Sequence, residues 1–222
     1  MSARQTLSEI NRITRALIEL GLCNDQNFPV SDENTGGSFE ITVHNRQALT
    51  KALKNVGYRE IYYELLKEKC FNVLMVDGAL LAFRYRFQND SIAEHNLTYF
   101  PSPDLDQFQN EPDIYLDDLV YADIVARNIV AFPIRFDFSN DSGKYVEVRH
   151  PYSHLTLGQF KNCRIPVSAP VSPSDFCQFI LRNFYNTAFT AYSDRIPTGE
   201  FRFERTISLM ESELPHLAVL HQ

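Results

Sequence analysis

The sequence predicts an α+β fold in which an antiparallel sheet of five or six strands packs against helices. The chain of 222 residues contains 17 Phe and 11 Tyr but no Trp, and such aromatic residues favour strands. Two pairs of apolar runs are joined by turn sequences, which predicts two hairpins. Segments with helical spacing lie before and after these pairs. Because no repeat or low-complexity linker divides the sequence, we expect a single domain over residues 1–222.

The N-terminal third predicts three helices and one strand. In TLSEINRITRALIELG, Thr6 and Glu9 fit a capping box, apolar residues recur at helical spacing, and Gly21 ends the pattern. Residues 24–38 are polar and are expected to form a loop before a short strand, FEITV. A second helix is expected to begin at Asn45, and REIYYELLKEK predicts a third.

The middle of the chain predicts the two hairpins. In FNVLMV-DG-ALLAFRYRF, Asp77-Gly78 is a dipeptide that tight hairpin turns prefer. The second run alternates, with Arg84 and Arg86 on one face and aromatic residues on the other. HNLTYF predicts the next strand. The second hairpin is expected to join NIVAFPIRFDF to KYVEVRH through SNDSG, and Pro133 suggests an edge position or a bulge.

The remaining segments predict mainly helices. Residues 172–188 have Ser172 at the capping position, Pro173 in the first turn, and apolar residues spaced three and four apart. The stretch Ser102–Asp123 carries seven acidic residues and no Lys or Arg, and it is expected to contain a short helix. The C-terminal segment is expected to form a strand and then a short helix ended by Pro215.

Composition narrows the class of protein. The formal net charge of −7 opposes non-specific binding to nucleic acid, although a local basic face is still compatible with it. No apolar run approaches the roughly 18 residues of a membrane span, and the N-terminal residues lack the apolar block of a secretion signal. Four scattered cysteines predict reduced thiols. We therefore expect a cytoplasmic protein with no membrane contact.

Several signatures of nucleotide-dependent enzymes, serine hydrolases and zinc proteases are absent. The chain contains no G-x-G-x-x-G, no G-x-x-x-x-G-K-[ST], no G-x-S-x-G and no H-E-x-x-H. Nucleotide-dependent and serine-hydrolase chemistry are therefore not expected, and no cofactor is predicted.

The stretch RHPYSHLTLG places two histidines, His150 and His154, four residues apart. A straight strand would put them on one face but about 13 Å apart, too far for one metal ion; a bend at Pro151-Tyr152 would close the gap. No third ligand lies at a diagnostic spacing, so no metal site is predicted. Either histidine suits acid–base catalysis at neutral pH. Purely structural roles, hydrogen-bonded to backbone or packed against tyrosine, are the alternative.

Charged side chains on three predicted strands are expected to share one face of the sheet, if these strands are neighbours. An ordinary solvated face with ion pairs is one interpretation. A surface that contacts phosphate or RNA is the other, because the guanidinium fork matches phosphate oxygens. The residues concerned are Arg84, Arg86, Arg135, Asp137, Glu147 and Arg149.

Three stretches carry a resemblance to a known family. They are FRYRFQND with AEHNLTYFPSP, then PIRFDF, and then the long stretch from His150 to Tyr185. The chain resembles small bacterial proteins grouped as a domain of unknown function, over nearly its whole length. The resemblance implies a bacterial cytosolic protein encoded beside mobile-element or phage-defence genes, and it implies no activity.

A second, local similarity covers about 20 residues. Toxins of bacterial toxin–antitoxin pairs carry an Arg-aromatic-Asp strand followed by a histidine-containing strand, which Arg135, Phe136 and Asp137 and then His150 and His154 resemble. The histidines of this chain depart from the close pairing in that group.

Two functions are therefore expected as alternatives. The first is a subunit that binds a protein partner, through its acidic run or its arginine face, in a defence-type or mobile-element-linked complex. The second is a small nuclease or phosphodiester-acting toxin in which His150 or His154 is the acid or base and Arg135, with Arg84 or Arg86, stabilises phosphoryl charge. A catalytic site requires a histidine within about 5 Å of Arg135 or Asp137 in a concave surface. The oligomeric state stays open.

Overall fold

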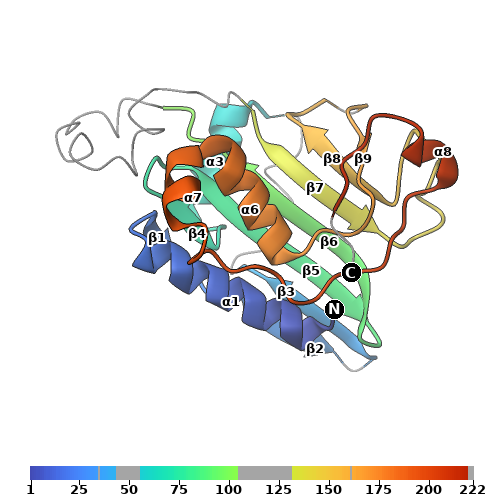
Figure 1. Cartoon of the computed structure of the whole chain (residues 1–222), viewed down its shortest axis with the longest axis horizontal. Helices are drawn as coiled ribbons and strands as arrows, with labels where there is room; N and C mark the ends of the chain where they lie inside the picture. Colours follow the sequence, from blue (N-terminus) through green and yellow to red (C-terminus); the bar gives the residue numbers. More distant parts are fainter. Residues whose placement is uncertain (35, 44–55, 105–131, 161, 220–222) are drawn as a thin grey trace.

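The computed structural model of the chain describes residues 1–34, 36–43, 56–104, 132–160 and 162–219 (Figure 1). In this part of the chain nine strands form one sheet, accompanied by five helices. The strands are β1 (Cys23–Gln26), β2 (Val30–Asn34), β3 (Ser38–Thr42), β4 (Val73–Met75), β5 (Leu80–Gln88), β6 (Ser91–Phe100), β7 (Ile134–Ser139), β8 (Ser153–Leu157) and β9 (Ile165–Pro166). The helices are α1 (Ala3–Glu19), α3 (Tyr58–Lys67), α6 (Pro173–Phe184), α7 (Asn186–Tyr192) and α8 (Leu209–Ser212).

The α+β class is confirmed, and the sheet is larger than the five or six strands expected. Its order is β1-β4-β5-β6-β7-β8-β9, and β3 joins it by pairing with β5 on one side and β2 on the other. All strand pairs are antiparallel. No helix among the described residues is long and apolar enough to span a membrane.

Helices cover the two faces of the sheet unequally. α1, α6 and α7 lie over one face (Figure 1), where the larger core joins them to inward residues of β5 such as Phe83 and Tyr85. Among the described helices, α3 lies over one end of the opposite face, against Leu80, Ala82 and Phe100. The rest of that opposite face carries the charged positions of the central strands.

The N-terminal segments differ from expectation in two places. α1 is capped by Ser2, which forms a capping box with Gln5, so Thr6 lies inside the helix and the predicted cap at Thr6 and Glu9 is wrong. The predicted end at Gly21 is confirmed by its φ of 69°. The loop expected over residues 24–38 instead contains β1 and β2, since pairing with β4 and β3 outweighs their polar sequence. The helix expected from Asn45 falls outside the described residues.

The first predicted hairpin is confirmed and the second is wrong. β4 and β5 pair across the Asp77-Gly78 turn. β7 pairs with β8, whereas residues 144–150 form turns with one isolated bridge. Val148 has a φ of 67°, which interrupts an extended strand. Pro133 lies just before an interior strand, so the edge position expected for it is also wrong.

The C-terminal half agrees in outline. Ser172 caps α6 with Pro173 in its first turn, but the helix breaks at Tyr185 (φ −132°, ψ 48°) and continues as α7. Residues 201–207 form no strand, and α8 ends before Pro215. The helix expected in the acidic stretch lies in residues 105–131, outside the described part.

One buried histidine ties the sheet to the segment that enters α6. His95 of β6 lies between two backbone groups: the N–H of Val171 donates to its Nε2 at 2.9 Å, and its Nδ1 lies 3.2 Å from the carbonyl oxygen of Phe136. A carbonyl only accepts, so the proton is on Nδ1 and the ring is neutral. Burial lowers the pKa of His95 to about 4.

This histidine predicts loss of stability in acid. The unfolded chain takes up the proton near pH 6.5 and the folded chain only near pH 4, so the stability provided by neutral His95 is lost as the pH falls between these values. The difference corresponds to about 3 kcal/mol. Urea unfolding at pH 7 and at pH 4 measures the loss, and His95→Gln is expected to flatten it. An equal loss in that variant would contradict the assignment.

Candidate functional site

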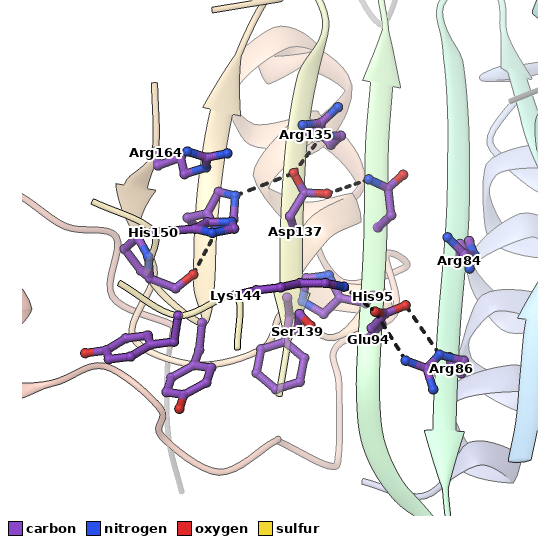
Figure 2. Close-up of a pocket in the computed structure, with 16 residues that line it drawn as sticks. Arg84, Arg86, Glu94, His95, Arg135, Asp137, Ser139, Lys144, His150 and Arg164 are labelled. Carbon is purple, nitrogen blue, oxygen red and sulfur yellow. Dashed lines mark hydrogen bonds and ion pairs between the residues drawn. The ribbon is translucent and has the colours of Figure 1, made fainter. Parts of the chain in front are cut away.

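A cleft of about 250 Å³ opens on the sheet face opposite to the one that α1 and α6 cover. β5 to β8 form its floor, and the turn segment of residues 139–152 and Arg164 form its walls (Figure 2). Its ionisable side chains are Arg84, Arg86, Glu94, His95, Arg135, Asp137, Lys144, Tyr145, His150, Tyr152, His154 and Arg164.

Strand register explains why these polar positions meet. Antiparallel pairing aligns Arg84 with Asn96, Asn96 with Asp137, and Asp137 with His154, in one row across four strands. Successive side chains of a strand alternate between faces, so this row points away from the larger core. The polar alternation seen in each strand thus becomes a single polar surface.

Asp137 is the centre of the hydrogen bonding in the cleft. Its Oδ1 accepts from Asn96 Nδ2 at 2.5 Å, and its Oδ2 accepts from Arg135 Nε at 2.6 Å. The hydroxyl of Thr98 donates to Asn96 Oδ1 at 3.1 Å, which fixes the orientation of that amide. His154 Nε2 lies 3.7 Å from Asp137 Oδ2. The carboxylate therefore orients one arginine and faces one imidazole.

The two histidines are close together because the chain bends at Pro151 and Tyr152. Their ring centroids lie 5.2 Å apart with the planes at 63°. The straight strand of the first interpretation is therefore wrong, and the bend that it left open is confirmed. His154 is 6% exposed, and its Nδ1 lies 3.0 Å from the carbonyl oxygen of Pro151. His150 is half-buried, and within the described residues its ring has no hydrogen bond.

The hydrogen bond to Pro151 places a proton on Nδ1 of His154, since the carbonyl only accepts. Burial lowers the pKa of His154, and the Asp137 carboxylate opposes that effect. The ring is therefore neutral at pH 7, with the lone pair of Nε2 facing the side of Asp137. An imidazolium that forms there is stabilised by the carboxylate.

Positive charge exceeds negative charge around the cleft. Five of its lining side chains are arginine or lysine and only two are carboxylates. Arg86 contacts Glu94 through two nitrogens at 3.3 and 3.2 Å, and Lys144 contacts the same carboxylate at 3.1 Å. These two cations lower the pKa of Glu94 against the desolvation that raises it. Arg164 makes no ion pair with any described residue.

The structure brings together six of the seven residues predicted for the site. Arg84, Arg86, Arg135, Asp137, His150 and His154 all line the cleft. The seventh, Arg149, is exposed and does not line it, because residues 144–150 are not the strand that would have aligned Arg149 with the others. Glu147 is exposed on the same turn segment.

Sequence reasoning missed Lys144, Arg164 and the tyrosine pair at the rim. Tyr145 and Tyr152 stack with ring centroids 4.2 Å apart and planes at 9°. The strand-like alternation of residues 144–150 does not mark Lys144 or Tyr145 as site residues, because the segment forms turns instead of the strand that it predicts. Arg164 directly precedes β9, whose pairing with β8 brings it to the cleft.

No group of three or more His, Cys, Asp or Glu side chains in the described ranges has the geometry to hold a metal ion. Among the described residues that line the cleft are hydrogen-bond donors and the imidazoles of His150 and His154, whereas both ring nitrogens of His95 are bonded to backbone groups.

A buried carboxylate supports the wall of the cleft. Glu211 of α8 is 1% exposed; its Oε1 accepts from the N–H of Val148 at 3.2 Å and its Oε2 from the N–H of Ser208 at 3.0 Å. The first bond holds the turn segment that carries Lys144 and His150. The side chain therefore joins α8 to this wall.

We expect Glu211→Ala to lower the free energy of unfolding by about 1–3 kcal/mol, because two backbone donors lose their partner. The exposed neighbour Glu213 provides the control, and Glu213→Ala should have an effect within about 0.5 kcal/mol. Chemical denaturation of the three proteins measures both values. Equal free energies of unfolding for the Glu211→Ala and Glu213→Ala variants would contradict the supporting role assigned to Glu211.

Comparison with known proteins identifies a family but no individual curated protein or solved structure that resembles the chain. The family model described as an uncharacterized conserved protein, DUF2290, matches residues 22–219. No curated protein and no solved structure matches the chain. The chain therefore belongs to the DUF2290 family.

Proposed function

We propose that this member of an uncharacterised family is a phosphodiester-acting enzyme of the bacterial cytoplasm, and that the cleft is its active site. The observation that supports this most is the convergence of an imidazole, a carboxylate and a guanidinium. His154 Nε2 lies 3.7 Å from Asp137, which in turn accepts from Arg135 at 2.6 Å, within a concave surface. A binding module with a flat face would not need this arrangement.

The charge of the cleft suits a phosphate ester. Guanidinium groups match phosphate oxygens through paired N–H donors. Arg135 uses its Nε for Asp137, which leaves its terminal nitrogens for a ligand. Arg164, with no ion pair among the described residues, provides a second guanidinium beside His154. The local charge excess explains how a chain with a net charge of −7 can bind an anion.

The geometry supports acid–base catalysis by the histidine pair. His154, neutral because burial lowers its pKa, takes the proton of the attacking hydroxyl or water at Nε2. The oxygen attacks phosphorus while the bond from phosphorus to the leaving oxygen breaks, and His150, which enters the step as an imidazolium, gives its proton to that leaving oxygen and becomes neutral. Asp137 stabilises the imidazolium of His154, while Arg135 and Arg164 stabilise the charge that accumulates on the phosphoryl oxygens.

The experiment is a cleavage assay with labelled single- and double-stranded RNA and DNA, each with Mg²⁺, with Mn²⁺ and with a chelator. We expect the wild-type protein to cleave at least one substrate and the His150→Ala/His154→Ala variant to be inactive while folded, as judged by circular dichroism. The absence of cleavage of every substrate, or equal cleavage by the variant, would contradict the proposal.

Binding to a protein partner, as in a defence-type or mobile-element-linked complex, is the alternative. The same cations would then receive acidic side chains of the partner, and the histidines would be structural. A partner-binding face does not need a histidine, a carboxylate and a guanidinium gathered in a concave site, and for this reason we favour the enzyme.

A further inference from the structure

A second pocket of about 630 Å³ adjoins the cleft on the same face of the sheet. Asn96, Arg135 and Arg164 line both cavities, so the two share a wall of two guanidinium groups and an amide. A ligand whose phosphate lies between these two arginines can therefore extend into the second pocket. Lys144 lines the cleft and does not line this second pocket.

The second pocket differs from the cleft in its chemistry. Arg135 and Arg164 are its only charged lining residues among those described, and aromatic rings from three separate elements line it: Tyr58 of α3, Phe100 of β6 and Phe160 after β8. Neutral hydrogen-bonding side chains also line the pocket, namely those of Thr98, Thr156, Gln159 and Asn162.

Phe160 is an exposed aromatic ring at this pocket. It is 71% exposed, whereas Phe100 is buried. The turn after β8 brings it there: Gly158 has a φ of 65°, and its N–H donates to the carbonyl oxygen of Pro133 at 2.7 Å. An added Cβ at Gly158 would lie 3.4 Å from the Phe160 ring, so the ring lies against the turn. An exposed aromatic ring is a surface on which a flat aromatic group can stack.

We propose that this second pocket binds the nucleobase of the substrate, so that the phosphodiester is part of a nucleotide or nucleic acid. The inference rests on the proposed function, since the phosphate must lie in the cleft. A nucleotide carries an anionic group and a flat aromatic group on one sugar, and it needs two adjoining sites of these two kinds. Every base has a face that stacks on an aromatic ring, while neutral side chains pair with its edges.

Isothermal titration of the full chain with three kinds of ligand tests the inference. The ligands are inorganic phosphate, ribose 5-phosphate and the four ribonucleoside 5′-monophosphates. Stacking of a base on an aromatic ring predicts that at least one nucleotide binds about 5- to 100-fold more tightly than ribose 5-phosphate. Phe160→Ala should abolish this difference and leave the affinity for ribose 5-phosphate unchanged.

Phe28→Ala is the matched control, because Phe28 is also an exposed phenylalanine (44%) and lines neither cavity. It should retain the preference for nucleotides. Equal affinity for ribose 5-phosphate and all four nucleotides would overturn the base site while leaving the phosphate site intact. If none of the ligands binds, inorganic phosphate included, the phosphate site is overturned and this inference with it.

Discussion

We expect replacement of His150 by Ala to lower the rate of phosphodiester cleavage by about 10²- to 10⁴-fold, the usual contribution of a positioned acid or base. His150 is the more accessible of the two imidazoles, and its ring has no hydrogen bond to any other described residue. The loss should therefore appear in kcat with little change in stability. Steady-state kinetics on the best substrate of the cleavage assay measures it.

His216→Ala controls for the loss of a histidine elsewhere. His216 is half-buried in the C-terminal segment, where its Nδ1 lies 2.9 Å from the carbonyl oxygen of Leu214, and it does not line the cleft. Its replacement should leave kcat unchanged. A His150→Ala enzyme with wild-type kcat would exclude His150 from the chemistry.

The second large effect is expected at Arg135. Replacement by Ala removes the guanidinium assigned to the phosphoryl group and leaves the Asp137 carboxylate without its 2.6 Å donor. Loss of one such stabilising donor typically costs about 10²- to 10³-fold in kcat. Arg135→Lys keeps the positive charge but lacks the paired N–H donors of the guanidinium group, so it should recover only part of the rate.

Arg149→Ala is the matched control for Arg135, because Arg149 is exposed on the neighbouring turn segment and lies outside the cleft lining. It should retain the wild-type rate. The kinetics of all three variants at equal protein concentration, with unfolding curves, separate catalysis from stability. Full activity in a folded Arg135→Ala protein would contradict the role assigned to Arg135.

The strands of the site were predictable because their patterns are local. FRYRF and IRFDF alternate strictly, so the common face of Arg84, Arg86, Arg135 and Asp137 follows once β5, β6 and β7 are neighbours. The α6 cap at Ser172 is likewise a signal of a few residues. These features need no knowledge of distant contacts.

The features that were missed depend on distant contacts. β1 and β2 have polar sequences and are strands because other strands pair with them. Residues 144–150 have the alternation of a strand, but Val148 takes a positive φ and donates its N–H to Glu211, 63 positions along the chain. Because residues 144–150 form turns instead of a strand, Arg149 lies outside the cleft lining and Lys144 belongs to it. Sequence periodicity contains no information on such a contact.

The central claim is that the cleft holds a phosphate ester beside the two histidines. Titration of labelled protein with ribose 5-phosphate, followed through the imidazole signals in NMR spectra, tests this most directly. We predict that the signals of His150 and His154 shift together and saturate, while those of His216 stay in place. Unchanged signals of both cleft histidines at saturating ligand would contradict the claim.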